Sequence, residues 1–380
     1  MNIIITIGRG LLQLLYGLQK LAPVRKRITF ISRQSNHPSV DIELLRDEIR
    51  REMPDYEVVV LCKKIESKPA YIWHMLTAQM HCLATSEVVV LDTYCILASL
   101  LRHRPQLRIL QMWHALGAYK KFSLSILGRA EGRSPAIARA MRMHQGYDRI
   151  LASSEAAVPG LEEAYGYGPE AFEILPLPRV DLLRDPAWLE QKRAEILAAC
   201  PQLDPAKRTL LYAPTFRKTE LEIAKIAELA DAVDADRYNL IISAHPLMKE
   251  RLRLSDKVIV LDGYTTMEQL AVCDFFISDY SAVIFEAAAA GKPIWFYAYD
   301  IDHYVENRGF YLDPLTELPS DPKRTAAEVL AAIEAVGPDG RPAYDWQRLS
   351  AFTDKYIAPV EHCTASVTAL IRRMAEEGRP

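Results

Sequence analysis

Residues 275–297 read FFISDYSAVIFEAAAAGKPIWFY, and this stretch decides the fold class. Residues 275–278 and 294–297 are short runs of apolar, β-branched and aromatic residues, as expected of buried strands. A helical segment lies between them, which Ser281 can cap at its start and Gly291 can end. Strand, helix and strand in this order predict a parallel βαβ unit.

The same alternation continues on both sides of this unit. Further strands of the second half are expected at residues 209–213, 239–244 and 257–261. Those of the first half are expected at residues 27–32, 57–62, 87–92, 108–113, 149–153 and 172–175. A stretch rich in proline and charge, residues 176–205, separates the two series and holds one clear helix at 188–199. We therefore expect an α/β protein of two Rossmann-like, doubly wound domains facing a central cleft.

The predicted domain bounds follow from this division. Residues 1–26 form an N-terminal amphipathic helix, 27–185 a first Rossmann-like domain and 186–340 a second. Residues 341–380 are predicted to be C-terminal helices that can cross back to the first domain. The best helix candidates near the end of the chain are residues 325–335 and 359–377.

Length and composition agree with this organisation. The chain has 380 residues, half of them hydrophobic and a quarter charged, which suits two globular domains. With 46 Lys and Arg against 49 Asp and Glu, the net charge is −3, so no nucleic-acid partner is expected. Six cysteines without a C-x-x-C pair, mostly in apolar runs, indicate reduced thiols of a cytosolic protein rather than a disulfide or zinc framework.

The N-terminal segment raises the question of a membrane. On a helix, Arg9, Gln13, Gly17 and Lys20 share one side, while the other side carries Leu11, Leu14, Leu15, Leu18 and Leu21. The basic cluster Arg25, Lys26 and Arg27 follows, and no small-residue cleavage site does. This pattern predicts a helix lying on anionic lipid at the cytoplasmic face of the membrane. The alternative is an amphipathic helix packed on its own domain.

Ligands of open α/β sheets bind outside the carboxyl ends of the strands, so the residues that follow each strand are candidates for a site. In the second domain these residues include Pro214, Thr215, Arg217, His245, Asp279, Tyr280 and Ser281. In the first domain they are Trp113 and His114, with Gly117, Lys120 and Lys121 close behind. A neutral imidazole can take a proton from a hydroxyl, and a protonated one can stabilise a phosphate, so His114 and His245 are the candidate catalytic residues.

Residues 278–281 and the helix after them offer the most groups that could bind a ligand. A strand stops at Ser278 and a helix follows, whose free amide hydrogens can face an anionic diphosphate. Glu286 lies one turn into the helix, where its carboxylate can accept hydrogen bonds from a ribose. The alternative is a capped core helix in which these side chains act structurally.

Residues 115–147 form a basic stretch in an otherwise acidic chain. They carry Lys120, Lys121 and four arginines against Glu131 alone. Such a patch would attract a phosphorylated acceptor or an anionic bilayer. The alternative is a solvated helical face.

These residues, in this order, resemble the CDP-glycerol glycerophosphotransferase family, the teichoic acid primases and polymerases of bacterial envelopes. The matching pieces are residues 111–122 (QMWHALGAYKKF), 147–150, 153–154, 178–181 (PRVD), 212–217 (YAPTFR), 245–246, 277–281 (ISDYS), 291–293, 299–300 and 308–311 (RGFY). One departure lies at residues 113–117, which read WHALG where many members have WHGTP. This change concerns the acceptor loop and leaves the catalytic class intact.

The resemblance implies a GT-B fold whose C-terminal domain holds a CDP-alcohol and whose N-terminal domain receives a lipid-linked acceptor. The family's two essential histidines match His114 and His245, and its phosphate-binding loops match residues 214–217 and 278–281. We expect transfer of glycerol phosphate, or else ribitol phosphate, from a CDP-alditol to a polyprenyl-diphosphate-linked acceptor, with release of CMP. His114 is the expected general base, and His245 and Arg217 are expected to stabilise the phosphates.

No convincing divalent-ion cluster is seen, so no cofactor is expected and we predict that the reaction is independent of metal. Two alternatives remain. A GT-B glycosyltransferase that uses a nucleotide sugar would need the same helix and glutamate. A non-catalytic, membrane-bound assembly protein would keep the fold without turnover.

Overall fold

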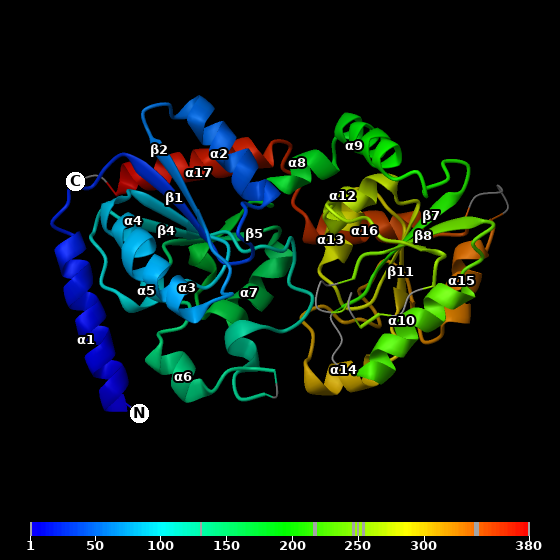
Figure 1. Ribbon diagram of the computed structural model, residues 1–380, viewed down its shortest axis with the longest axis horizontal. Helices are drawn as coiled ribbons and strands as arrows, with labels where there is room; N and C mark the ends of the chain where they lie inside the picture. Colours follow the sequence, from blue (N-terminus) through cyan, green and yellow to red (C-terminus); the bar gives the residue numbers. More distant parts are fainter. Residues whose placement is uncertain are drawn as a thin grey trace. The chain divides into compact units, whose positions relative to one another are not determined.

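A computed structural model describes residues 2–129, 131–215, 219–244, 248, 251–252, 255–337 and 342–378, without the side chains of residues 2–6 and 221 (Figure 1). The chain forms two compact units. Unit 1 comprises Met1–Ala115, Phe122–Asp181 and Ala358–Pro380, and unit 2 comprises Leu116–Lys121 and Leu182–Ile357. The division thus falls after Asp181, whereas the sequence suggested residue 185, and the predicted region 341–380 is shared between the units.

Unit 1 is built on a parallel sheet with the strand order β2-β1-β3-β4-β5-β6. Its strands are β1 (Arg27–Ser32), β2 (Glu57–Cys62), β3 (Val88–Leu91), β4 (Arg108–Gln111), β5 (Arg149–Ala152) and β6 (Phe172–Ile174). Its helices are α1 (Asn2–Gln19), α2 (Val40–Glu52), α3 (Lys68–His74), α4 (Met80–Thr85), α5 (Ile96–Leu100), α6 (Pro135–Ala140), α7 (Val158–Tyr165) and α17 (Cys363–Glu377), and α8 (Arg179–Leu183) spans the division. The strands read as continuous apolar runs because helices cover both faces of the sheet.

Unit 2 is built on a second parallel sheet, with the order β12-β11-β10-β7-β8-β9. Its strands are β7 (Arg208–Ala213), β8 (Tyr238–Ile242), β9 (Val258–Ile259), β10 (Phe275–Ser278), β11 (Ile294–Tyr297) and β12 (Pro322–Lys323). Its helices are α9 (Pro186–Ala199), α10 (Glu220–Ala232), α12 (Thr266–Gln269), α13 (Val283–Ala289), α14 (Ile301–Asn307), α15 (Ala326–Glu334) and α16 (Trp346–Tyr356). Helices α10 and α15 pack on one face of this sheet, with Ile226, Leu229 and Val329 fully buried.

The C-terminal helix α17 packs beside α2 in unit 1 (Figure 1). Asp181 holds its first turn, because the Asp181 carboxylate accepts hydrogen bonds from the backbone N–H groups of Cys363 (2.7 Å) and Thr364 (2.8 Å). Near its other end, Arg372 donates to the backbone carbonyl of Glu52 at 2.8 Å. The last segment of the chain is therefore an integral part of unit 1.

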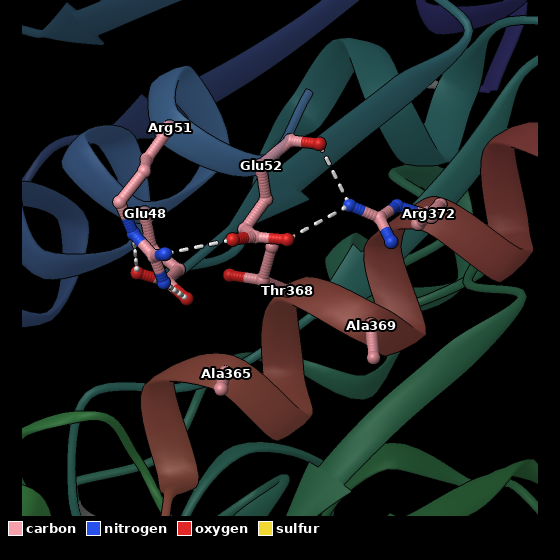
Figure 2. A pocket seen from close by; sticks show the side chains of 7 residues that line it. All are labelled: Glu48, Arg51, Glu52, Ala365, Thr368, Ala369 and Arg372. Carbon is pink, nitrogen blue, oxygen red and sulfur yellow. Dashed lines mark hydrogen bonds and ion pairs between the residues drawn. The ribbon is translucent and has the colours of Figure 1, made fainter. Parts of the chain in front are cut away.

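A pocket of about 270 Å³ lies between α2 and α17 (Figure 2). Its charges are paired with one another: Arg51 contacts Glu48 at 2.7 Å and Glu52 at 2.8 Å, and Glu52 also contacts Arg372 at 3.5 Å. Because the pair of Glu52 and Arg372 joins the two helices, we interpret the pocket as part of their packing contact.

Helix α1 packs against the rest of unit 1 through its polar side. Tyr16 is fully buried and donates to the carbonyl of Leu83 at 2.9 Å, while Gln13 accepts from the N–H of Arg102 at 2.8 Å. The opposite side is exposed, with Leu11 at 59%, Leu14 at 65% and Leu18 at 60%. Among the described residues, no helix has the length and apolarity needed to cross a bilayer.

Candidate active site

Each sheet has one point at which successive connections diverge to opposite sides, which is where ligands bind in such folds. In unit 1 this point lies between β1 and β3, and in unit 2 between β7 and β10. Arg33 and Asp92 follow the two strands of unit 1, and His114 lies beyond the neighbouring strand β4. Thr215 and Asp279 lie beyond the two strands of unit 2. The candidate residues therefore collect at the expected edge of each sheet.

His114 has a defined orientation in unit 1. Its Nδ1 lies 3.0 Å from the backbone carbonyl oxygen of Asp92, and the ring is partly exposed. A carbonyl oxygen can only accept, so Nδ1 carries the hydrogen of the neutral ring. Nε2 then keeps its lone pair, which is the form that a general base requires.

The surroundings of His114 keep its ring neutral. Removal of the ring from water, together with the charges of Arg179 and Arg33, lowers the pKa of His114 to about 4, although the hydrogen bond to the Asp92 carbonyl and the charge of Asp41 oppose this shift. Asp41 is fully buried and accepts hydrogen bonds from the Nε and the backbone N–H of Arg179, each at 2.9 Å. At pH 7 the imidazole is therefore unprotonated, the state in which a general base acts.

Asp92 is a buried acid that the sequence did not single out. Its side chain is 2% exposed, and neither carboxylate oxygen has a hydrogen-bond partner in the described part of the chain. Burial is the largest cause of a shift that raises the pKa of Asp92 to about 6. The sequence signal for Asp92 was its position as an acidic residue at the end of an otherwise apolar strand.

Trp113, predicted to contact the acceptor, has an unusual backbone. Its φ is +62°, in the left-handed region that bulky residues rarely adopt. Its ring stacks on Phe122 with centroids 4.5 Å apart and lies 3.8 Å from the ring of His114. The turn that carries His114 is therefore strained and tightly packed.

In unit 2, Asp279 joins the two loops at the switch point. Its carboxylate accepts from the backbone N–H of Thr215 at 2.9 Å, from the Thr215 hydroxyl at 2.6 Å and from the N–H of Tyr280 at 2.6 Å. A carboxylate in this position would repel a phosphate directly. We therefore interpret Asp279 as a brace that orders the loops around a donor.

The other predicted donor residues divide into buried and partly exposed ones. Ser278 is fully buried and donates to the carbonyl of Ala213 at 3.1 Å, and Tyr280 is fully buried and donates to Asp300 at 3.0 Å. Pro214 and Glu286 are also buried, whereas Thr215 and Ser281 are partly exposed. Ser281 accepts from the N–H of Val283 at 3.4 Å, although Ala282 is the N-cap of α13. Thr215 and Ser281 are thus the accessible members of this set.

A pocket of about 230 Å³ lies at the carboxyl ends of β8 and β9. Gln269 holds one side of it, because its Nε2 donates to the carbonyl of Tyr264 at 2.9 Å. The lining residues are Ile242, Ser243, Ala244, Val260, Leu261, Gly263, Tyr264, Thr265, Thr266 and Gln269. Sequence reasoning did not find this pocket, because its walls come from three separate segments of unit 2.

Gly117, Lys120 and Lys121 belong to unit 2 rather than to the first domain, where they were predicted to bind the acceptor. A Cβ at Gly117 would lie 2.5 Å from the ring of Phe285, so this position requires glycine. Lys121 donates its N–H to the carbonyl of Gly309 at 3.1 Å, and Lys120 forms a bridge with Phe310. The segment that follows His114 is therefore fixed on unit 2.

His245, predicted to be catalytic, and Arg217, predicted to bind the donor phosphates, lie outside the described residues. Of the basic cluster predicted to face a bilayer, Arg25 and Lys26 are exposed, and Lys26 pairs with Asp55. Arg27 is a correction: it is 4% exposed, and its guanidinium contacts Glu57 at 2.8 Å. In the described part of the chain, no three His, Cys, Asp or Glu side chains gather as a metal site would require, and metal independence stays a prediction.

Comparisons with known proteins identify the family. The family model described as CDP-Glycerol:Poly(glycerophosphate) glycerophosphotransferase matches residues 14–362. A teichoic acid ribitol-phosphate primase of Bacillus spizizenii is 29% identical over 90% of this chain and 89% of that protein. A teichoic acid glycerol-phosphate primase of the same organism is 28% identical over 76% of this chain and 75% of that protein.

A solved structure of the wall teichoic acid polymerase TagF covers 99% of this chain with a TM-score of 0.76 at 19% identity, and the match covers 98% of the TagF chain. This likeness confirms the predicted GT-B fold. Because the family model spans most of the chain, the protein belongs to the CDP-glycerol:poly(glycerophosphate) glycerophosphotransferase family.

Proposed function

We propose that the chain transfers glycerol phosphate or ribitol phosphate from a CDP-alditol to a hydroxyl of a polyprenyl-diphosphate-linked acceptor, in the synthesis of teichoic acid or a related envelope polymer. Family membership supports the CDP-alditol donor, and the relatives include primases for both alditols. The observation that carries the catalytic step is the orientation of His114, whose Nδ1 is engaged and whose Nε2 is free to accept a proton.

The proposed chemistry is a single displacement. The acceptor hydroxyl oxygen attacks the phosphorus that bears the alditol, and its proton passes to Nε2 of His114. The bond from this phosphorus to the bridging oxygen of the diphosphate breaks, and CMP leaves with that oxygen. Positioning and electrostatic stabilisation carry most of the catalysis in such transfers. His245 and Arg217 are assigned to the charge on the transferred and leaving phosphates.

Unit 2 is proposed to hold the donor. Thr215 and Ser281 lie at its switch point, where a diphosphate would bind. The pocket at the ends of β8 and β9 is large enough for a pyrimidine and lies one to two strand spacings from β7. Since neighbouring strands are about 4.8 Å apart, this separation suits the reach from a diphosphate to its base.

A donor screen tests the activity. The purified protein is incubated with a synthetic lipid-linked primer and, in turn, with CDP-glycerol, CDP-ribitol and nucleotide sugars. The masses of the products are then measured by mass spectrometry. We expect CMP and a primer extended by an alditol phosphate. Transfer of a sugar would favour the glycosyltransferase alternative, and absence of turnover with every donor would favour an assembly protein.

We further propose that the protein is peripheral at the cytoplasmic face of the membrane, bound to anionic lipid through α1. The helix uses Tyr16 and Gln13 to contact unit 1 and leaves Leu11, Leu14 and Leu18 exposed. Burying these leucines in a bilayer would be favourable, because each Å² of apolar area removed from water contributes about 25 cal/mol of binding free energy. The six cysteines, all free, agree with a reducing compartment.

Vesicle flotation tests this binding. A Leu11→Ser, Leu14→Ser and Leu18→Ser triple variant should lose most of its binding to phosphatidylglycerol vesicles, because the apolar side of α1 is removed while its polar contacts remain. Ile65→Ser, at a residue 47% exposed elsewhere in unit 1, is the control and should bind as the unaltered protein does. Undiminished binding by the triple variant would assign the contact to another surface.

A further inference from the structure

The strained turn that carries His114 is held by a buried amide. Gln111, the last residue of β4, is fully buried. Its side-chain Oε1 accepts a hydrogen bond from the backbone N–H of Trp113 at 2.9 Å. Its Nε2 donates to the backbone carbonyl of Thr93 at 3.4 Å. Gln111 thus connects the end of β4 with the segment that follows β3.

This connection has a direct bearing on His114. The left-handed conformation of Trp113 reverses the chain directly after β4, so that the ring of His114 returns toward β3. There its Nδ1 meets the carbonyl of Asp92, the residue that precedes Thr93. A bulky residue keeps a left-handed conformation where the surrounding contacts enforce it. The contacts at Trp113 include the bond to Gln111, the stack on Phe122 and an edge-to-face contact with Tyr165.

We propose that Gln111 is a positioning residue of the transfer reaction, which fixes the turn at Trp113 and thereby the orientation and tautomer of His114. The inference rests on the proposed role of His114 as the general base. Both functions of the amide are needed, because one end must accept from Trp113 and the other must donate to Thr93. An amide satisfies both partners, whereas an ionised carboxylate can only accept.

The first variant removes both bonds. Gln111→Met keeps the volume and the apolar contacts, and we expect kcat to fall about 10- to 100-fold, the cost of a misplaced catalytic group. The KM for the CDP-alditol should change less than about twofold, because the proposed donor residues lie in unit 2. Gln79→Met is the control: Gln79 is also a buried amide of unit 1, at 1% exposure, and its replacement should leave kcat unchanged.

The second variant gives a signature that a merely structural residue would not show. In Gln111→Glu, an ionised carboxylate would repel the carbonyl of Thr93, while a protonated one would restore the donor. The ratio of its kcat to that of the unaltered protein should therefore rise as the pH falls from 8 to 5.5. The introduced acid would face Tyr147 and lie opposite Leu91 of β3, and His114 itself faces Arg33, Arg179 and Asp41.

A double variant separates this inference from the proposed function. In a His114→Ala background, Gln111→Met should cause no further loss of kcat, because Gln111 acts through His114. A normal kcat for folded Gln111→Met beside an inactive His114→Ala would overturn the role of Gln111 alone. A normal kcat for His114→Ala would overturn the proposed base. A flat pH ratio for Gln111→Glu would also contradict the positioning role.

Discussion

The carboxyl edges of the two sheets present opposite chemistry. At the edge of unit 1, polar groups keep unused bonding capacity: Nε2 of the partly exposed His114 keeps a lone pair, and the buried Asp92 carboxylate has no hydrogen-bond partner in the described part of the chain. At the edge of unit 2, the Asp279 carboxylate accepts three hydrogen bonds from Thr215 and Tyr280. One edge is prepared to exchange a proton, and the other is ordered to hold a ligand.

The difference teaches how one architecture supports two tasks. A general base must keep a free lone pair, so its support comes from the other ring nitrogen and from the backbone. A binding loop must instead be rigid before the ligand arrives, so its own polar groups bond to each other. Loss of a residue at the first edge should therefore reduce kcat, and loss at the second should raise the KM for the donor.

The largest effect is expected at the first edge. His114→Ala removes the proton acceptor, and kcat should fall about 10²-fold or more, with little change in the KM for the CDP-alditol. Steady-state kinetics with a lipid-linked primer measures both constants. His37→Ala, at an exposed histidine of the same unit, is the control. A change confined to the KM would contradict the assignment.

A smaller effect is expected at the second edge. Asp279→Ala removes the Oδ1 atom that accepts from three donors, so two backbone N–H groups and the Thr215 hydroxyl lose this acceptor. Such a loss costs about 1–3 kcal/mol, and loosened loops should raise the KM for the donor about 10-fold while kcat changes less. Asp313→Ala is the matched control, because Asp313 accepts from Leu315 and Thr316 in an exposed loop. A fall in kcat with a normal KM would show that Asp279 takes part in the chemistry.

The sequence predicted the strands well because strands buried on both faces are unbroken apolar runs. β1, β2, β10 and β11 have the predicted bounds. β12 (Pro322–Lys323) was missed, because a two-residue edge strand that contains proline has no such pattern. Helix α16 was not located either, although residues beyond 325 were expected to be helical.

The candidate site was predicted by position but not by role. His114, Thr215 and Asp279 lie beyond strand ends, as the sequence predicted, whereas the sequence could not reveal that Asp279 bonds to Thr215 across 64 residues of chain. Nor does any local pattern indicate the left-handed backbone of Trp113. Tryptophan disfavours this conformation, and contacts with residues distant in the sequence enforce it. The attachment of Gly117 to unit 2 depends in the same way on contact with Phe285.

The smallest expected effect is a loss of folding stability at acid pH, which we assign to the histidines of unit 1. Burial lowers the pKa of His144 to about 3 and that of His114 to about 4, and the pKa of an unfolded histidine is about 6.5. Below pH 6.5 the unfolded chain therefore binds protons that the folded chain refuses, and stability falls as the pH falls. Asp92 has the opposite sign, because its raised pKa of about 6 favours the folded state below that pH.

Replacing His144 isolates one of these contributions. His144 has a φ of +58°, which asparagine tolerates, and its Nδ1 lies 2.9 Å from the Tyr147 hydroxyl, a bond that an amide can keep. His144→Asn should recover about 2 kcal/mol of the stability lost between pH 7 and pH 5, as measured by urea unfolding at the two values. His37→Asn should recover none, since this side chain is exposed. An equal loss in His144→Asn and the unaltered protein would mean that the ring of His144 is protonated in the folded state, and the acid sensitivity would then have to arise outside the core of unit 1.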